Sequence, residues 1–440
     1  MPMSHLVPSA RPGMGVALAL AVLTIMFFQL PFYKSEAGPL FLLAKIWPVL
    51  LAPLVLYGIL AISLPDRALY LVFSIYALVL TPFLSMLYLP NGLIDALAST
   101  VKTGPITYYF SAAAALALLR PSEKMLERCL LVLGALTFAL MLMLWVTVPV
   151  ELYQPGIAGQ KMFSWESERG NFIRMPMMLG MLCLFWLAHC FAAKGRWTHG
   201  LLLLGGFVCL ILIYKARLPT GVAILLGAMV IGWSLPLRLR WALGALAMVP
   251  LALVAMIQGP RLPSLLAEIF DESLFIRLRS VTAAWNWLAD DPLKLLFGTG
   301  SSSTFSDYGL NDHLNAPDFW LTDIGWLGVL LEYGIIGTAL IVLIHARALQ
   351  LAWRVQGKDP FRRALVTYVM FEIMCSTVYS VMYTPGPVVT IAAIAWWLGL
   401  RDKMGVTRDQ HGLTPPAANP PSTAAPPGWA LGRVPRGGAD

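Results

Sequence analysis

Long apolar runs, most of them ending at charged residues, proline or glycine, constrain the fold of this chain more than any other feature. A helix needs about 20 apolar residues to cross the roughly 30 Å of hydrocarbon in a bilayer, and many runs reach that length. Hydrophobic residues make up 58% of the chain and charged residues only 12%, whereas soluble domains carry about 25% charged residues. Lipid must therefore solvate most of the surface. We expect an all-α polytopic membrane protein, because helices satisfy their own backbone hydrogen bonds in lipid.

The apolar runs predict about twelve membrane helices within a transmembrane domain of residues 1–405. The remaining tail, residues 406–440, is rich in Pro, Ala and Gly and lacks apolar periodicity, which is typical of disordered segments. The predicted spans are residues 14–33, 39–62, 67–89, 104–119, 127–149, 175–193, 198–214, 219–236, 241–257, 323–344, 364–384 and 386–400.

The basic residues orient these predicted helices. Lys and Arg concentrate in the cytoplasmic loops of membrane proteins, and with the N-terminus inside, every short loop on that side carries at least one of them. An even number of spans then puts both termini in the cytoplasm. This role in topology explains the net charge of +8, so we do not expect nucleic acid as a partner.

All five cysteines lie within apolar runs, and no CxxC or His-rich cluster accompanies them. Cysteines in such runs behave as small apolar side chains. The sequence therefore predicts neither a metal site nor a cofactor.

A set of basic residues runs against the charge bias, because it lies just beyond the membrane on the predicted extracytoplasmic side. The planar guanidinium group suits a bidentate grip on phosphate or carboxylate. Some of these side chains can instead extend to lipid phosphates at the interface. We favour an anion-binding site for the set as a whole. Its members are Arg169, Arg174, Lys215, Arg217, Arg261, Arg277 and Arg279.

Residues 258–322 form the one long predicted loop, about 65 residues, and loops of this length are usually functional or disordered. Aromatic and aliphatic residues throughout it argue against disorder. Its stretch SLFIRLRSVTAAWNWLADDPLKLLFG predicts an amphipathic helix along the membrane surface that ends near Asp290-Asp291-Pro292. Arg277 and Arg279 would lie within that helix but cannot share one narrow face.

Three features follow towards the end of the loop. The segment FGTG can leave backbone N–H groups free for an anion, but a plain turn explains it equally well. Asp323 at the start of the tenth span can be a helix cap or a functional carboxylate. Glu332 lies inside an apolar helix, where an ionisable group is costly and indicates function unless it pairs with a buried Arg or with Lys45.

Together these segments resemble the O-antigen ligase and Wzy-type polysaccharide polymerase superfamily. The similarity covers roughly residues 150–345 and rests on the order of four segments. SERGNFIRMP is similar to the family's Arg-Gly-x-Phe segment, and YKARLPTG to its Ser-Arg turn. An Arg-containing amphipathic stretch then leads into FGTG and Phe305, and LLEYGIIG carries its Glu nine positions after an acidic residue.

The resemblance implies an inverting, metal-independent glycosyltransferase of GT-C-like architecture in a bacterial inner membrane. Its donor would be an undecaprenyl-pyrophosphate-linked oligosaccharide and its acceptor a second lipid-linked unit, with a chain-length regulator as a candidate partner. By position, Arg169 and Arg217 correspond to the family's pyrophosphate-handling arginines, and Arg277 or Arg279 to its loop arginine. Supporting roles would fall to Arg174, Lys215 and Glu332.

The chain departs from the family pattern at the expected base. Ligases carry His-Asn where this chain has Asp323-Ile324, and an Asp there is more familiar in repeat-unit polymerases. The nearest histidine is His313, so the general base is open between Asp323 and His313. Met175 and Ala216 also replace residues that the family usually carries.

The leading hypothesis is therefore a polymerase that joins repeat units into exopolysaccharide or O-antigen. A ligase that transfers finished glycan to lipid A core or protein is the rival within the same chemistry. A transporter or flippase of the lipid-linked glycan is the alternative of another class. Transporters often carry related halves, which this sequence does not show, and its polar residues gather on one face of the membrane.

Overall fold

The structure, a computed structural model, divides into two units, Met1–Gly399 and Leu400–Asp440. All elements below lie in the first unit except the end of the last helix, which continues into the second. The predicted tail 406–440 lies almost entirely outside the described residues. These are residues 13–33, 38–89, 91–155, 162–240, 262–301, 310–314, 316, 319–380, 382 and 384–410.

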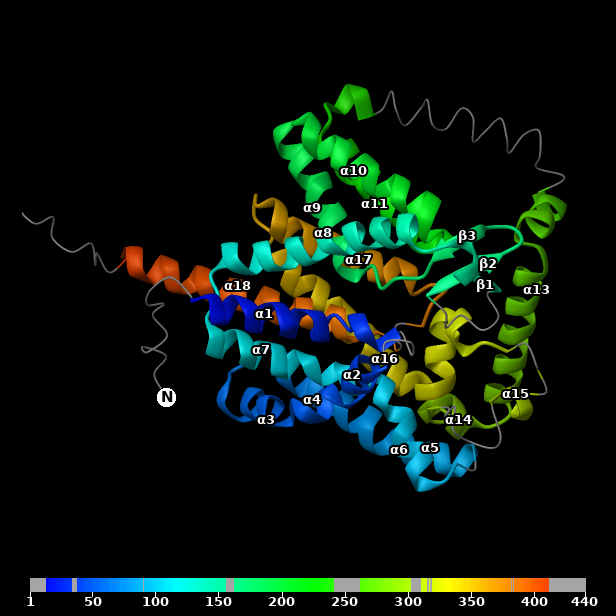
Figure 1. Ribbon diagram of the computed structural model, residues 1–440. Helices are drawn as coiled ribbons and strands as arrows, with labels where there is room; N and C mark the ends of the chain where they lie inside the picture. The colour runs from blue at the N-terminus through cyan, green and yellow to red at the C-terminus, as the bar shows by residue number, and fades with distance from the viewer. Residues whose placement is uncertain are drawn as a thin grey trace, which may run out of the picture. The chain divides into compact units, whose positions relative to one another are not determined.

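Helices dominate the described chain (Figure 1). A helix overlaps every predicted span except residues 241–257, which lie outside the described residues. The α-helices are α1 Met14–Phe27, α2 Pro39–Leu50, α3 Ala52–Ala61, α4 Arg67–Ile75, α5 Thr81–Tyr88, α6 Leu93–Ser99, α7 Tyr108–Leu119, α8 Glu123–Thr147, α9 Met178–Lys194, α10 Trp197–Cys209, α11 Arg217–Ser234, α13 Leu262–Ala289, α14 Pro292–Phe297, α15 Leu310–His313, α16 Gly325–Val355, α17 Pro360–Cys375 and α18 Gly386–Gln410. Short 3₁₀ or π turns are η2 Leu30–Tyr33, η4 Tyr76–Leu80, η5 Thr100–Lys102, η6 Gly104–Thr107, η7 Val150–Leu152, η8 Leu210–Tyr214 and η10 Leu321–Asp323.

Among the residues that the structure describes, six helical segments are long and apolar enough to cross a membrane. This agrees with the predicted all-α membrane protein, whereas the number of about twelve spans, the GT-C-like architecture and the orientation stay predictions. Shorter apolar helices cover Met14–Phe27, Gly104–Leu119 and Met178–Lys194. The six are Pro39–Ala61, Arg67–Tyr88, Glu123–Thr147, Trp197–Tyr214, Arg217–Ser234 and Gly325–Val355.

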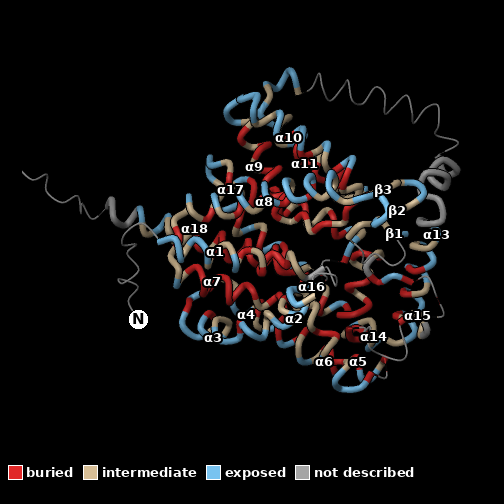
Figure 2. Tube along the Cα trace, viewed as in Figure 1, coloured by how far each residue is buried: buried red, intermediate tan, exposed pale blue. Residues whose placement is uncertain are grey.

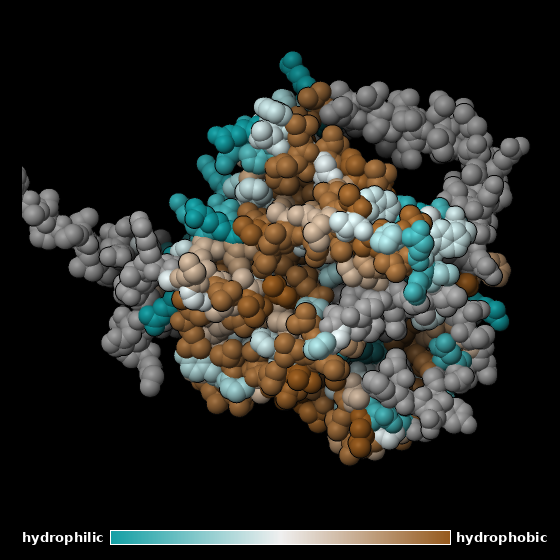
Figure 3. Space-filling model, in the orientation of Figure 1, coloured by the Kyte–Doolittle hydropathy of each residue, from teal (hydrophilic) through white to brown (hydrophobic). Residues whose placement is uncertain are grey.

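Burial follows the packing of these helices (Figure 2). Helix α9 packs against α8, α10, α11 and α17 and is buried along most of its length. Helices α8 and α10 instead expose large apolar side chains such as Leu142 and Leu202. Apolar surface covers much of the face shown in Figure 3, which is expected where lipid rather than water is the solvent.

Polar residues cap the start of several helices. Ser122 accepts a hydrogen bond from the backbone N–H of Met125 at 3.2 Å and begins α8. Asp291 accepts one from Leu293 at 2.9 Å, with Pro292 as the first residue of α14. Such caps satisfy donors that have no partner within the helix. The cap at Asp291 separates α14 from α13, close to the predicted end of the amphipathic helix.

Two structural features lie outside the predicted spans, namely helix α13 and a small sheet. Helix α13 runs across the direction of α1, α7 and α8 rather than alongside them (Figure 1). A small sheet was not predicted: β1 Gln154–Pro155 is parallel to β2 Phe163–Glu166, which is antiparallel to β3 Gly170–Ile173. In the β2–β3 hairpin Glu166 pairs with Gly170, so the connecting turn contains Arg169.

Candidate functional site

Glu166, the last residue of β2, forms ion pairs with two of the predicted site arginines. Glu166 lies 3.2 Å from the Nε atom of Arg169 and 3.1 Å from a terminal nitrogen of Arg174. The Arg174 guanidinium group also lies over the ring of Phe172, 5.2 Å from its centroid. The hairpin register sets this arrangement, because it brings Glu166 at the end of β2 opposite the start of β3.

The connection from α10 to α11 brings two more basic residues to the same turn. A π-helical turn, η8, ends at Lys215, whose backbone is left-handed with a φ of 52°. The Lys215 ammonium group donates a hydrogen bond to the backbone carbonyl of Arg169 at 2.5 Å. Arg217, the first residue of α11, lies 2.7 Å from Glu168. Arg169, Arg174, Lys215 and Arg217 therefore form one cluster, which we call the hairpin cluster.

Charge in the hairpin cluster is unbalanced among the described residues. Its four basic side chains face two carboxylates, those of Glu166 and Glu168. All of these groups are at least partly exposed. A surplus of positive charge at an accessible position is suited to an anionic ligand.

A second group of predicted residues meets around Tyr379, in the segment that follows α17. The Tyr379 phenol interacts electrostatically with the charges of Asp323, Arg277 and Arg169. These charges come from η10, α13 and the β2–β3 turn. Tyr379 thus links Asp323 and Arg277 to the hairpin cluster through Arg169.

The two arginines of α13 have different surroundings. Arg277 is half-buried, whereas Arg279 is exposed. Two positions on a helix differ by about 200° in direction, so only one of them can face the rest of the molecule. The structure therefore brings Arg277, and not Arg279, to the other candidate site residues.

His313, the other candidate base, lies in different surroundings. Its ring is stacked on that of Trp287, with centroids 6.3 Å apart and planes 10° from parallel. The ammonium group of Lys294 also lies over the Trp287 ring, 4.9 Å from its centroid. The structure thus gives His313 a packing role beside α13 and α14.

The FGTG segment is a structural turn rather than an anion-binding loop. Helix α16 is broken at Gly334, where φ is 60° and ψ is −172°. The backbone N–H groups of Thr299 and Gly300 donate to the carbonyls of Leu331 and Glu332, at 2.9 and 3.1 Å. The Gly298 N–H donates to the backbone carbonyl of Lys294, at the end of α14. All three N–H groups have backbone partners, so they are not available to an anion.

Glu332, placed by the break in α16, is buried and pairs with Lys102. Lys102 comes from η5, in a loop that the sequence places on the extracytoplasmic side. Lys45, the partner named from the sequence, lies over the ring of Phe41 at 5.1 Å. Glu332 is therefore part of a buried ion pair that ties η5 to α16. Nothing in the sequence spacing signals this partner, because the two residues are far apart in the chain.

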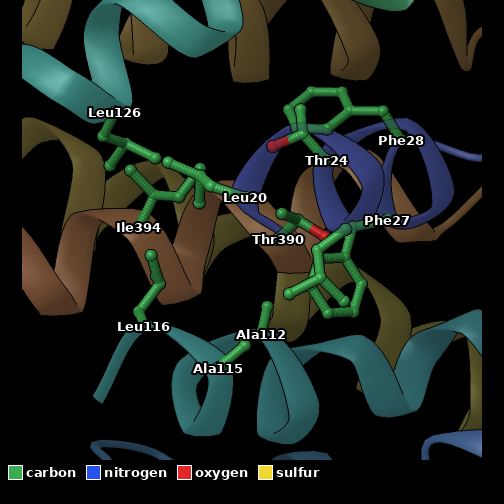
Figure 4. Close-up of a pocket in the computed structure, with 11 residues that line it drawn as sticks. Leu20, Thr24, Phe27, Phe28, Ala112, Ala115, Leu116, Leu126, Thr390 and Ile394 are labelled. Carbon is green, nitrogen blue, oxygen red and sulfur yellow. The ribbon is translucent and has the colours of Figure 1, made fainter. Parts of the chain in front are cut away.

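A small pocket lies elsewhere, between α1, α7, α8 and α18 (Figure 4). Its lining is apolar apart from Thr24 and Thr390, and it contains none of the candidate site residues. It offers no group that could hold a pyrophosphate.

Within the described residues no group of three or more His, Cys, Asp and Glu side chains could hold a metal ion. The candidate site thus consists of the hairpin cluster together with Arg277, Asp323 and Tyr379. Of these, Tyr379 was missed by sequence reasoning, since an isolated tyrosine near the end of an apolar run carries no signal. Models of known protein families give no match to the chain, and a comparison with curated proteins finds none either.

Proposed function

We propose that this chain is a polymerase that joins undecaprenyl-pyrophosphate-linked oligosaccharide repeat units into an exopolysaccharide or O-antigen, on the periplasmic face of a bacterial inner membrane. The observation that supports it most directly is the meeting of Arg169, Arg277 and Asp323 around Tyr379. Two cations and a carboxylate from three separate elements are the groups that this transfer needs. The similarity of residues 150–345 to the polymerase and ligase superfamily adds the substrate class.

The proposed reaction is a displacement at the anomeric carbon of the donor. An acceptor sugar hydroxyl forms the new glycosidic bond, while the bond from the anomeric carbon to the pyrophosphate oxygen breaks. The undecaprenyl pyrophosphate leaves with the electron pair of that bond. Arg169 and Arg277 would stabilise its charge, since preorganised cations are most effective where charge develops. The acceptor proton passes to Asp323 as general base.

Asp323 is preferred to His313 as the base because of its neighbours. Asp323, Arg169 and Arg277 all interact electrostatically with the Tyr379 phenol. The His313 ring is instead stacked on Trp287. Lys215 and Arg174 have supporting roles in this proposal, because they bind the Arg169 carbonyl and Glu166.

The proposal is tested with Arg169→Ala in a strain that depends on this chain for its polymer. Removal of a charged donor from the site should lower polymer formation about a hundredfold, and single lipid-linked repeats should accumulate. The control is Arg238→Ala, an exposed arginine after α11, which should leave polymer unchanged at equal amounts of protein in the membrane.

The nature of the accumulated lipid-linked glycan separates the three hypotheses. Single repeats facing the periplasm support a polymerase. Long lipid-linked polymer would contradict it in favour of a ligase, and repeats retained on the cytoplasmic face would favour a flippase. Polymer of normal length in Arg169→Ala would show that the candidate site is wrong.

A further inference from the structure

Tyr379 lies at a tight junction between α16 and α17. Helix α17 ends at Cys375, and the Tyr379 backbone N–H donates to the carbonyl of Cys375 at 3.0 Å. Close by, Gly325 begins α16 with a φ of 50°, and a Cβ atom there would overlap the carbonyl oxygen of Thr377. Only glycine permits both this φ and this contact. The backbone junction therefore holds the start of α16 against the segment that carries Tyr379.

This junction explains why Asp323 is a neighbour of Tyr379. Asp323 precedes Gly325 by two residues, and Thr377 precedes Tyr379 by two. The short η10 turn, in which the Asp323 N–H donates to Trp320 at 3.0 Å, ends directly before α16. Two backbone segments in contact at Gly325 and Thr377 thus carry the carboxylate and the phenol to the same place.

Two cations complete the surroundings of this phenol. The charges of Arg277, from the inner side of α13, and of Arg169, from the β2–β3 turn, both act on it. Tyr379 as a residue is 37% exposed, so part of it lies at the surface of the described chain. A phenol that shares its surroundings with two guanidinium groups can act as a third donor to an anion that they bind.

The protonation state of the phenol decides which role it can take. Because a tyrosine phenol has an ordinary pKa of about 10, Tyr379 keeps its proton at neutral pH. It is therefore a hydrogen-bond donor to an anion and not a base. Asp323, in contrast, can accept a proton, so the two side chains offer complementary functions.

We propose that Tyr379 is a catalytic residue whose hydroxyl donates a hydrogen bond to the pyrophosphate group of the lipid-linked donor, beside Arg169 and Arg277. This assignment rests on the proposed function for the identity of the ligand. The segment after α17 would then contact the leaving group directly, through Tyr379.

The test measures the affinity of the purified full-length chain in lipid nanodiscs for inorganic pyrophosphate. Tyr379→Phe removes only the hydroxyl group. A hydrogen bond to a charged group contributes about 1.5–3 kcal/mol, so we expect about tenfold to hundredfold weaker binding. The matched control is Tyr153→Phe, whose ring packs edge-on against Trp145 and Phe163. It should leave the affinity unchanged.

Each outcome separates this proposal from the proposed function. Weaker binding in both Tyr379→Phe and Arg169→Ala, with normal thermal stability, supports the proposal. Weaker binding in Arg169→Ala alone overturns the role of Tyr379 and leaves the anion site intact. Normal binding in both variants overturns the pyrophosphate site itself. Polymer formation by the wild-type chain is measured in a separate experiment. If the wild-type chain forms polymer but Tyr379→Phe binds pyrophosphate normally, only the role of Tyr379 is overturned.

Discussion

Each arginine of the hairpin cluster is held by a carboxylate. Glu166 binds Arg169 and Arg174, and Glu168 binds Arg217. Exposed ion pairs of this kind contribute only about 0–1 kcal/mol to stability. Their main effect is to orient the guanidinium groups before a ligand arrives. In the proposed function, a pyrophosphate carries more negative charge than one carboxylate and would displace Glu166 and Glu168 from these groups.

Single substitutions at Asp323 and His313 test which of the two residues is the general base. Asp323→Asn keeps the size of the side chain but cannot accept a proton, so polymer formation should fall by about 10²–10⁴-fold. His313→Phe keeps a flat ring on Trp287 and should retain nearly wild-type activity. The measurement is the rate of polymer formation in membranes that contain equal amounts of each variant. Loss of activity in His313→Phe with a normal Asp323→Asn would reverse the assignment.

The break in α16 gives three elements a common junction. Tyr76, in the π-helical turn η4, donates its hydroxyl to the carbonyls of Phe297 and Tyr333 at 2.7 and 2.8 Å. Ser85 in α5 donates to the carbonyl of Ser301 at 2.9 Å. The FGTG turn thus lies between α16 and the segment Tyr76–Tyr88, and every polar group named here has a partner. Such fully bonded networks rigidify a core.

Gly300 is the most sensitive position of this junction. Its φ is 86°, and a Cβ atom there would overlap the backbone nitrogen of Ser85. Gly300→Ala should therefore destabilise the protein by about 1–3 kcal/mol from backbone strain alone, with a further loss from the overlap. Gly221→Ala is the control, because open space surrounds that position in α11. Thermal unfolding in detergent measures both, and equal melting temperatures for the two variants would contradict this view of the turn.

The elements that could be predicted from sequence are those governed by local pattern. Apolar runs predicted the helix positions, and spacings of three and four predicted α13, because both depend on neighbouring residues alone. The role of FGTG could not be predicted, since its donors pair with carbonyls that become available only when α16 breaks at Gly334. The partner of Glu332 was missed for the same reason, because Lys102 reaches it only through the fold.

Across the whole molecule, the candidate site was predicted in part. The sequence analysis expects Arg169, Lys215 and Arg217 on one side of the membrane, and the structure brings these three residues together. The distinction between Arg277 and Arg279 needed the orientation of α13. The place of Tyr379 in the site could not be predicted, because it depends on the contact between Gly325 at the start of α16 and Thr377 just after the end of α17. Pattern thus predicted the basic residues, and long-range packing selected among them.

The orientation in the membrane yields the last prediction. With both termini in the cytoplasm, α13 lies outside and the turn between α9 and α10 inside. A cysteine at Thr282, exposed on α13, should react with a membrane-impermeant maleimide in spheroplasts. One at Thr198, exposed at the start of α10, should react only after the membrane is opened. The unaltered chain is the control, because its own cysteines are buried or partly buried. Labelling of Thr198→Cys, but not Thr282→Cys, in intact spheroplasts would invert the topology and move the hairpin cluster to the cytoplasm.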